Sequence, residues 1–138
     1  MKIIQVVGRS NSGKTTFIKQ LIPILKTHGR VAVIKHLGDH EFELEMGKDT
    51  TGFFDTGADI SVGIDAHKSV AAIRNNSLEG TLKLLFEQGI DFTVIEGFKQ
   101  KSFPRIVIGV LETDQCILTN PCPGDVLASI DAFEDFHL

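Results

Sequence analysis

The sequence predicts a three-layer α/β domain with a mostly parallel sheet and some antiparallel strands. Short apolar runs alternate with segments of helical periodicity, which is the pattern of a parallel sheet covered by helices. An apolar run over 2–7 precedes a helical pattern over 14–28 and a second apolar run over 30–36. This order is typical of a right-handed crossover unit, so the two strands should pair in parallel. The length of 138 residues fits one domain with a sizeable core.

Local patterns predict the elements that follow the first helix. Pro23 interrupts and should kink that helix, and Gly29 ends it. Residues 41–46 alternate acidic and apolar side chains, as a half-exposed strand does. The glycine-rich stretch 47–59 should be a loop that leads into a short helix. Two adjacent strands are expected within 59–74.

The second half of the chain continues the alternation. An amphipathic helix is predicted from Ser77, its cap, to Gly89, its stop. Strands are predicted over 91–98 and 105–111, and the tail adds the short segments CILTN, DVLASI and DAFEDFHL. Neither a repeat nor an interdomain linker is visible in the sequence. We therefore expect a single phosphate-loop nucleotide-binding domain over 1–138, for the reasons given below.

Charge and cysteine content restrict the class of protein. The net charge of −4 argues against a nucleic-acid or anionic-membrane partner, because there is no basic excess to neutralise phosphates. No apolar run approaches the ~20 residues of a membrane-spanning helix, and no signal peptide is visible. Cys116 and Cys122 fit neither a zinc nor a redox spacing. The expectation is a cytoplasmic protein with two idle thiols.

Residues 8–15 carry the strongest functional signal. They read GRSNSGKT and fit G-x-x-x-x-G-K-[ST] at every fixed position, between a strand and a helix. Glycines let such a loop wrap a phosphate with its backbone N–H groups, and the helix adds its positive dipole end. Lys14 should reach the β- and γ-phosphates and act in catalysis, Thr15 should bind Mg²⁺, and Thr16 should contact the α-phosphate. The nucleotide-binding residues predicted are Gly8, Arg9, Ser10, Asn11, Ser12, Gly13, Lys14, Thr15 and Thr16.

Glu96 is the predicted second element of the site. It ends an otherwise apolar strand, and Gly97 follows it. A carboxylate at the end of a strand next to the phosphate loop can hold the water shell of a metal or orient the attacking water. Glu96 is therefore predicted to bind metal and to act in catalysis, with a capping or ion-pair role as the alternative.

The segment KHLGDHEFELE permits three interpretations. His36, Asp39 and His40 have a spacing that suits a transition-metal site on a helix, although here it falls in a loop. The same loop suits a switch that faces the nucleotide, with Asp39 near Mg²⁺. A solvated acidic face is the third interpretation.

With the phosphate loop, IKH, GKDT and VIEGFK in this order, the chain resembles the family of molybdopterin-guanine dinucleotide biosynthesis protein B (MobB). The similarity runs from Lys2 to about Val110. It implies a homodimeric phosphate-loop NTPase, usually taken to be a GTPase, in which two subunits meet near their nucleotides. It also implies GTP and Mg²⁺ as cofactors. The implied partner is the enzyme that joins GMP to molybdopterin.

The resemblance carries over to particular residues. Gly8, Gly13, Lys14, Thr15 and Thr16 match the phosphate loop of the family, Glu96 matches its acidic strand end, and Asp49 matches a loop acid of unassigned role. Arg105 stands where the family usually has lysine. Arg9 stands where MobB proteins generally have an uncharged residue, and it either reaches the partner subunit's phosphate or faces solvent. Asn120 and Asp125 lie at a distance along the chain that suits base recognition. The preference for guanine rests on the resemblance alone.

Three functions follow from these observations. The leading one is a slow GTP-binding NTPase that assists maturation of the molybdenum cofactor. A small-molecule kinase is the second, but such enzymes close an arginine-bearing lid, and only Arg74 lies between Arg30 and Arg105. The third is a non-hydrolysing adaptor, whose dimer and acidic edge over 41–46 would engage its partners.

Overall fold

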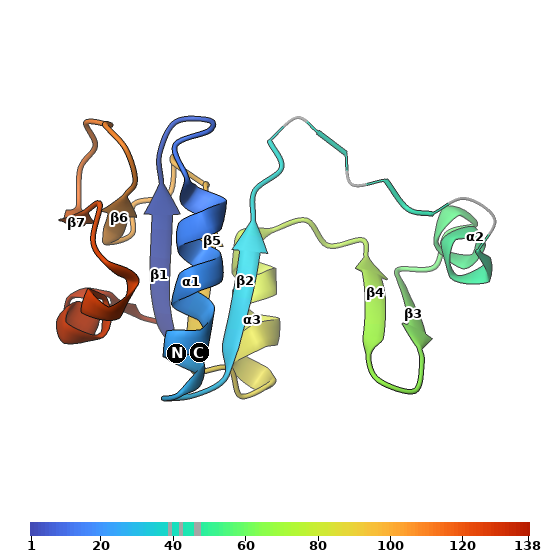
Figure 1. Ribbon diagram of the computed structural model, residues 1–138. Helices are drawn as coiled ribbons and strands as arrows, with labels where there is room; N and C mark the ends of the chain where they lie inside the picture. The colour runs from blue at the N-terminus through green and yellow to red at the C-terminus, as the bar shows by residue number, and fades with distance from the viewer. Residues whose placement is uncertain (39, 42, 46–47) are drawn as a thin grey trace. The chain divides into compact units, whose positions relative to one another are not determined.

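The computed structural model describes residues 1–38, 40–41, 43–45 and 48–138. The chain divides into two compact units, shown in Figure 1. The sheet unit comprises residues 1–36 and 82–138, and the hairpin unit comprises residues 37–81. A single nucleotide-binding domain over 1–138 stays a prediction.

The sheet unit is built on parallel strands in the order β2-β5-β1-β6-β7 (Figure 1). Their bounds are Val31–Lys35, Phe92–Glu96, Lys2–Val7, Arg105–Val107 and Cys116–Thr119. The short strand β8, Glu134–Asp135, pairs antiparallel with the start of β1. The chain passes from β1 to β2 on one side of β1 and later places β6 and β7 on its other side. Open α/β sheets bind ligands at such a reversal of strand order.

Strands β1 and β2 run parallel as predicted, but they are not neighbours. Strand β5 lies between them, so that Val94 faces Ile4 of β1 and Val33 of β2. The positions of β5 from 93 to 95 are fully buried, and a strand buried on both faces belongs inside a sheet rather than at its edge. The predicted pairing of adjacent strands was wrong for this reason.

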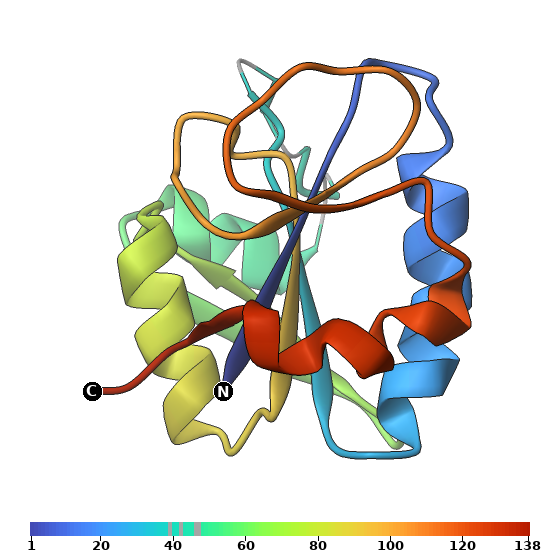
Figure 2. The same ribbon diagram turned by 90° about the vertical axis from the view of Figure 1, so that its left-hand side faces the viewer.

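Two helices complete the three layers. Figure 2 shows α1 (Lys14–Lys26) on one face of the sheet. Helix α3 spans Leu78–Glu87, and its residues 82–87, which belong to the sheet unit, lie on the other face. Helix α1 contains Pro23 and ends two residues before the predicted end. The main buried cluster lies between α1 and the sheet and consists of Ile4, Val6, Phe17, Ile18, Leu21, Leu25, Val94, Ile106, Ile108, Val126 and Phe133. The three-layer α/β architecture predicted from the sequence is confirmed.

The ends of α3 and β6 have local causes. The Ser77 hydroxyl accepts a hydrogen bond from the Gly80 N–H at 3.0 Å, and Gly89 follows the helix with φ +74°, as predicted for a cap and a stop. Strand β6 is shorter than the predicted 105–111, and the left-handed conformation of Gly109 (φ +84°) lies just beyond its end.

The tail after β7 contains two 3₁₀ helices, η1 (Pro123–Asp125) and η2 (Leu127–Ala132). The thiols of Cys116 and Cys122 are free, as expected, and both are exposed. None of the helices in the described part of the chain is long and apolar enough to cross a membrane.

The hairpin unit contains the short helix and the two strands predicted for it. Helix α2 spans Asp49–Asp55, and β3 (Ile60–Ile64) pairs antiparallel with β4 (Ser69–Ile73). The strand predicted over 41–46 is not found at positions 41 and 43–45, while Phe42 and Met46 lie outside the described residues. In the described part of this unit β3 and β4 pair only with each other, and the described residues of the acidic segment join neither of their free edges.

Candidate functional site

The predicted phosphate loop connects β1 to α1 and packs against the backbone that follows β6. A Cβ atom added to Gly8 would lie 2.4 Å from the Ile108 carbonyl oxygen and 2.6 Å from Ser12 Oγ, so only glycine fits there. Asn11 and Gly13 adopt left-handed conformations with φ +60° and +99°. Gly8 thus has a steric reason, which is the close approach of two backbone segments, and Gly13 has a conformational one, which is its positive φ.

The N-terminus of α1 is open toward the loop. Gly13 is the cap residue and offers no side chain to the first helical N–H groups, and the first turn carries no acidic residue. Its partial positive charge is therefore left for an anion. Ser12 Oγ is buried and has no partner among the described residues, so its hydroxyl is available to a ligand atom. Both features fit a bound phosphate.

Lys14 lies directly over the loop. Its Nζ donates hydrogen bonds to the carbonyl oxygens of Gly8 and Arg9, both at 2.9 Å. Burial lowers the pKa of Lys14; Glu96 opposes this effect, and the positive charges of Lys99 and Lys35 add to it. When the surroundings of a lysine disfavour its charge, a nearby anion stabilises the protonated form. This environment favours the polyanionic end of a nucleotide.

Thr15 and Glu96 are brought together as the sequence analysis expected for a metal site. The Thr15 hydroxyl lies 3.5 Å from Glu96 Oε1 and is oriented to donate to it. Glu96 is the last residue of β5 and is half-buried. A hydroxyl and a carboxylate oxygen suit Mg²⁺, which usually takes one or two protein ligands and completes its shell with water and phosphate. The two residues fit this ion, and their assignment as its ligands remains a prediction.

The other predicted loop residues are accessible. Arg9, Ser10 and Thr16 are exposed, so their side chains are available to a ligand or to a partner. Among the described His, Cys, Asp and Glu residues, no group of three or more could hold a metal ion. Asp39 lies outside the described residues. His40 and Asp49 belong to the hairpin unit, and His36 ends the first segment of the sheet unit.

One family, described as Molybdopterin guanine dinucleotide synthesis protein B (MobB), matches residues 3–131 of the chain. The chain belongs to the MobB family. The family identified from the phosphate loop and the three short motifs is thereby confirmed.

Relatives and solved structures agree with this MobB assignment. A molybdopterin-guanine dinucleotide biosynthesis adapter protein of Methanocaldococcus jannaschii is 35% identical over 112 residues, which cover 78% of this chain and 47% of that protein. One from Bacillus subtilis is 38% identical over 111 residues, covering 77% and 64%. The chain thus spans about half of the first relative and less than two thirds of the second.

The crystal structure of Bacillus subtilis MobB matches with a TM-score of 0.71 at 25% identity, over 97% of this chain and 99% of that one. A second crystal structure, of molybdopterin-guanine biosynthesis protein B, matches with a TM-score of 0.58 at 32% identity, over 76% and 67%. The fold of this MobB-family chain is therefore that of solved members of the family.

In this MobB-family chain the side chain of Asn120 binds the backbone next to the phosphate loop, and base recognition by Asn120 stays a prediction. Its Oδ1 accepts a hydrogen bond from the Gly109 N–H at 2.6 Å, and its Nδ2 donates to the Gly109 carbonyl at 3.0 Å. A Cβ added to Gly109 would lie 3.2 Å from Ser12 Cβ, so this clamp fixes the wall behind the phosphate loop. Asp125 lies in η1 and is exposed.

Two buried polar residues near the site were missed in the sequence analysis. Gln5 is fully buried in β1, and its Nε2 donates to the carbonyls of Gly97 and Phe98, both at 2.8 Å. Arg105, recognised only as a replacement of lysine, is 2% exposed and donates to the carbonyls of Lys99, Lys101 and Phe103. A lone amide within the apolar run KIIQVV was the available signal for Gln5.

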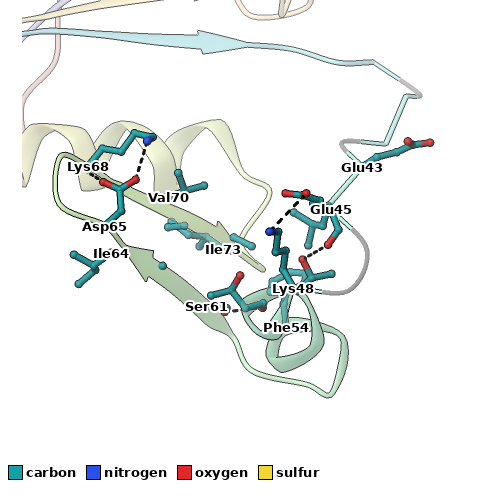
Figure 3. Close-up of a pocket in the computed structure, with 16 residues that line it drawn as sticks. Glu43, Glu45, Lys48, Phe54, Ser61, Ile64, Asp65, Lys68, Val70 and Ile73 are labelled. Carbon is teal, nitrogen blue, oxygen red and sulfur yellow. Dashed lines mark hydrogen bonds and ion pairs between the residues drawn. The ribbon is translucent and has the colours of Figure 1, made fainter.

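The hairpin unit of this MobB-family chain has a cavity of its own, of about 870 Å³. Figure 3 shows apolar side chains such as Ile64, Val70 and Ile73 together with charged ones such as Lys48 and Glu45 around it. The remaining lining residues are Glu43, Leu44, Thr50, Thr51, Phe54, Ser61, Gly63, Asp65, Lys68, Ala71 and Ala72. A mixed apolar and polar lining is typical of a surface that receives another molecule.

Proposed function

We propose that this MobB-family chain is a cytoplasmic, homodimeric GTP-binding protein with slow intrinsic hydrolysis, which serves as an adapter in the biosynthesis of molybdopterin-guanine dinucleotide. One observation carries the nucleotide part of the proposal. The open N-terminus of α1, the buried Ser12 hydroxyl and Lys14 converge on one loop. The pathway is inferred from the names of the relatives, of which the chain spans only part.

The roles of the site residues follow from their positions. The backbone N–H groups of the loop and Lys14 hold the β- and γ-phosphates, and Ser12 donates its free hydroxyl to a phosphate oxygen. Thr15 and Glu96 hold Mg²⁺, which when bound neutralises charge on the phosphates. Glu96 lies close enough to this position to orient an attacking water through its second oxygen.

Slow hydrolysis is supported by how the arginines are engaged. Arginine fingers raise phosphoryl-transfer rates by about 10³–10⁵-fold. Arg30 donates to the Gln88 carbonyl, Arg74 to carbonyls of the hairpin unit, and Arg105 is buried. Arg9 alone among the four arginines is exposed on the phosphate loop. The same engagement argues against the kinase alternative, which needs an arginine-bearing lid.

The hairpin unit supports an adapter role. Ile60, Val62 and Ile64 alternate along β3, so they share one face of the β3–β4 pair, and each is about half or more exposed. Clusters of exposed apolar side chains are typical of protein–protein contacts. We propose that this surface joins two copies of the chain or binds the enzyme that couples GMP to molybdopterin.

A thermal-shift comparison of GTP and ATP, each with Mg²⁺, tests the nucleotide assignment. At 100 times its dissociation constant GTP should stabilise the chain by about 2.7 kcal/mol. The shift should disappear in Lys14→Ala and persist in Lys26→Ala, which removes a lysine from the other end of α1. An unchanged shift in Lys14→Ala would contradict the proposed site, and equal shifts with ATP would contradict guanine preference.

Phosphate release in a single turnover, with and without the partner enzyme, tests the hydrolysis. We expect slow release from the chain alone. Bound GTP with no release under either condition would support the non-hydrolysing adaptor instead.

A further inference from the structure

The loop that follows β5, residues 97–103, is held from beneath by two buried polar side chains. Gln5 binds the carbonyls of Gly97 and Phe98, and Arg105 binds those of Lys99, Lys101 and Phe103. Neither side chain has more than 2% of its surface exposed. Five carbonyls of one short loop are thus turned inward onto two fixed donors, which sets the loop rigidly at the carboxyl edge of the sheet.

This arrangement is costly for the fold. Gln5 Oε1 is buried without a partner among the described residues, and such a group destabilises the folded state. Phe98 has φ +53°, a conformation that is unfavourable for a bulky residue. Strained backbone of this kind clusters at functional sites, where the surrounding structure enforces it. None of the roles proposed above for the phosphate loop requires either feature.

The strained residue holds an aromatic pair together. The Phe98 ring stacks on His36 with a centroid distance of 4.2 Å and an angle of 23°. The His36 N–H donates to the Glu96 carbonyl at 2.9 Å, which ties the end of β2 to the end of β5. A Cβ at Gly97 would lie 3.1 Å from His36 Cβ, so glycine keeps the two segments close. His36 is exposed, and the pair therefore offers a flat surface to a ligand.

Lysines flank this pair in the sequence. Lys35 immediately precedes His36 and faces Glu96 in the sheet register, and Lys99 immediately follows Phe98. Both lysines are exposed and are close enough to Lys14 to lower its pKa. Lys101 adds a further exposed cation to the loop, and Glu96 is the acid that faces the cluster.

We propose that His36 and Phe98, with Lys35 and Lys99, form a second ligand subsite beside the phosphate loop, which binds a phosphorylated planar heterocycle of the pterin phosphate class. The aromatic pair stacks with the heterocycle, and the lysines bind its phosphate group. A flat aromatic surface favours a planar ring of any kind, and the adjacent cations favour one that carries an anion. The inference rests on the proposed function in two respects, since it takes the pterin from the proposed pathway and assigns the position of Lys14 to the nucleotide.

The test uses the full chain saturated with GTP and Mg²⁺ and a fluorescent pterin that carries a phosphate monoester. Stacking should quench the fluorescence, and the same pterin without its phosphate should bind more weakly. Phe98→Gly removes the ring and also relieves the strained φ, so it should fold, and it should weaken probe binding tenfold or more. His36→Ala should act in the same direction. Phe53→Ala, which removes an exposed ring from the hairpin unit, is the control.

Lysine variants test the phosphate contact. Lys35→Gln and Lys99→Gln should each reduce the preference for the phosphorylated pterin, whereas Lys26→Gln should leave it unchanged. Equal affinity of the unmodified chain for the two pterins would overturn the proposed phosphate contact of Lys35 and Lys99.

The remaining outcomes separate this inference from the proposed function. Displacement of the probe by GTP, or full binding in Phe98→Gly and His36→Ala, would overturn the subsite. A GTP shift without any probe binding overturns the subsite and leaves the nucleotide role intact. Probe binding that depends on Phe98 in a chain without a GTP shift would support the subsite and contradict the nucleotide role.

Discussion

In the sheet unit the apolar side chains of β1, β5 and β6 are buried, whereas in the hairpin unit those of β3 and β4 reach the surface. Ile4, Val94 and Ile106 have no exposed area, while Ile64 is 80% and Val70 is 66% exposed. A unit of 45 residues buries a smaller share of its surface on folding than a larger one does. Under the proposed function this difference separates two tasks: the sheet unit would provide a rigid frame for phosphate contacts, and the hairpin unit would keep apolar surface for a partner.

Two arginines show the same difference. Arg105 of the sheet unit donates to loop carbonyls from a buried position, and its Nη1 also reaches Thr113 Oγ1 at 3.0 Å. Arg74 of the hairpin unit donates to the Ala58 and Phe54 carbonyls and lies over the Phe54 ring at 3.9 Å, but it is exposed. Water can replace the contacts of Arg74 and cannot replace those of Arg105.

Replacing each arginine by alanine is the strongest test of this comparison. Arg105→Ala leaves several buried carbonyls without donors and should lower the free energy of unfolding by about 3–5 kcal/mol. Arg74→Ala should cost about 1 kcal/mol or less, because solvent reaches the same carbonyls. Chemical denaturation of both variants measures the difference, and equal losses would contradict the assignment of rigidity to the sheet unit alone.

Ile64→Glu tests the exposed surface of the hairpin unit. The change should alter the free energy of unfolding of the monomer by no more than about 0.5 kcal/mol, as is usual for surface positions. It should weaken self-association by about 1.5–3 kcal/mol for each buried copy of the side chain. Sedimentation velocity measures the dimer. Val110, 85% exposed in the sheet unit, offers the matched control Val110→Glu, which should leave the dimer unchanged.

The pH dependence of GTP affinity tests the environment of Lys14. Only the protonated lysine binds phosphate strongly, and burial lowers the pKa of Lys14 below the usual lysine range. Affinity should therefore begin to fall, as pH rises, earlier than for an ordinary lysine, at most about tenfold per pH unit. Lys14→Arg keeps its charge and should give a flat profile. A flat profile in the unmodified chain would show that Lys14 does not contact the ligand.

The turn between β3 and β4 should show the smallest effect. Asp65 accepts hydrogen bonds from the N–H groups of His67 and Lys68 and pairs with Lys68 Nζ at 2.8 Å, and these contacts lower its pKa. A lowered carboxyl pKa stabilises the fold at neutral pH and loses this effect as pH falls. Asp65→Asn should lower Tm at pH 7 by no more than about 2 °C, and the difference should vanish in acid. A constant difference at all pH values would point to another cause.

Local features of the site were predictable from sequence because they depend on neighbouring residues. The loop over 8–15, the start of α1 at Lys14 and the end of β5 at Glu96 all follow from spacing and from glycine placement. The distance of 3.5 Å between Thr15 Oγ1 and Glu96 Oε1 agrees with the rule that parallel strands present their carboxyl ends at one edge of the sheet.

Tertiary features were not predictable. The insertion of β5 between β1 and β2 depends on competition among strands that are all apolar. The strand expected over 41–46 had a suitable alternation, but its described residues pair with neither free edge of the β3–β4 hairpin. Asn120 suggested base recognition by its position, yet its side chain binds Gly109, a contact fixed by the return of the chain after β7. The strain at Phe98 has no sequence signal apart from the buried amide of Gln5.

The pairing of β1 has a consequence for synthesis of the chain. The strand that carries the phosphate loop precedes all of its partners in the chain, which are Phe92–Glu96, Arg105–Val107 and Glu134–Asp135. At the usual rate of about 5–20 residues per second, this apolar strand waits several seconds on the ribosome before any of these partners has been made. A nascent chain that stalls before β5 would therefore expose the strand to chaperones, and the proposed nucleotide site could form only after β5 and β6 have been made.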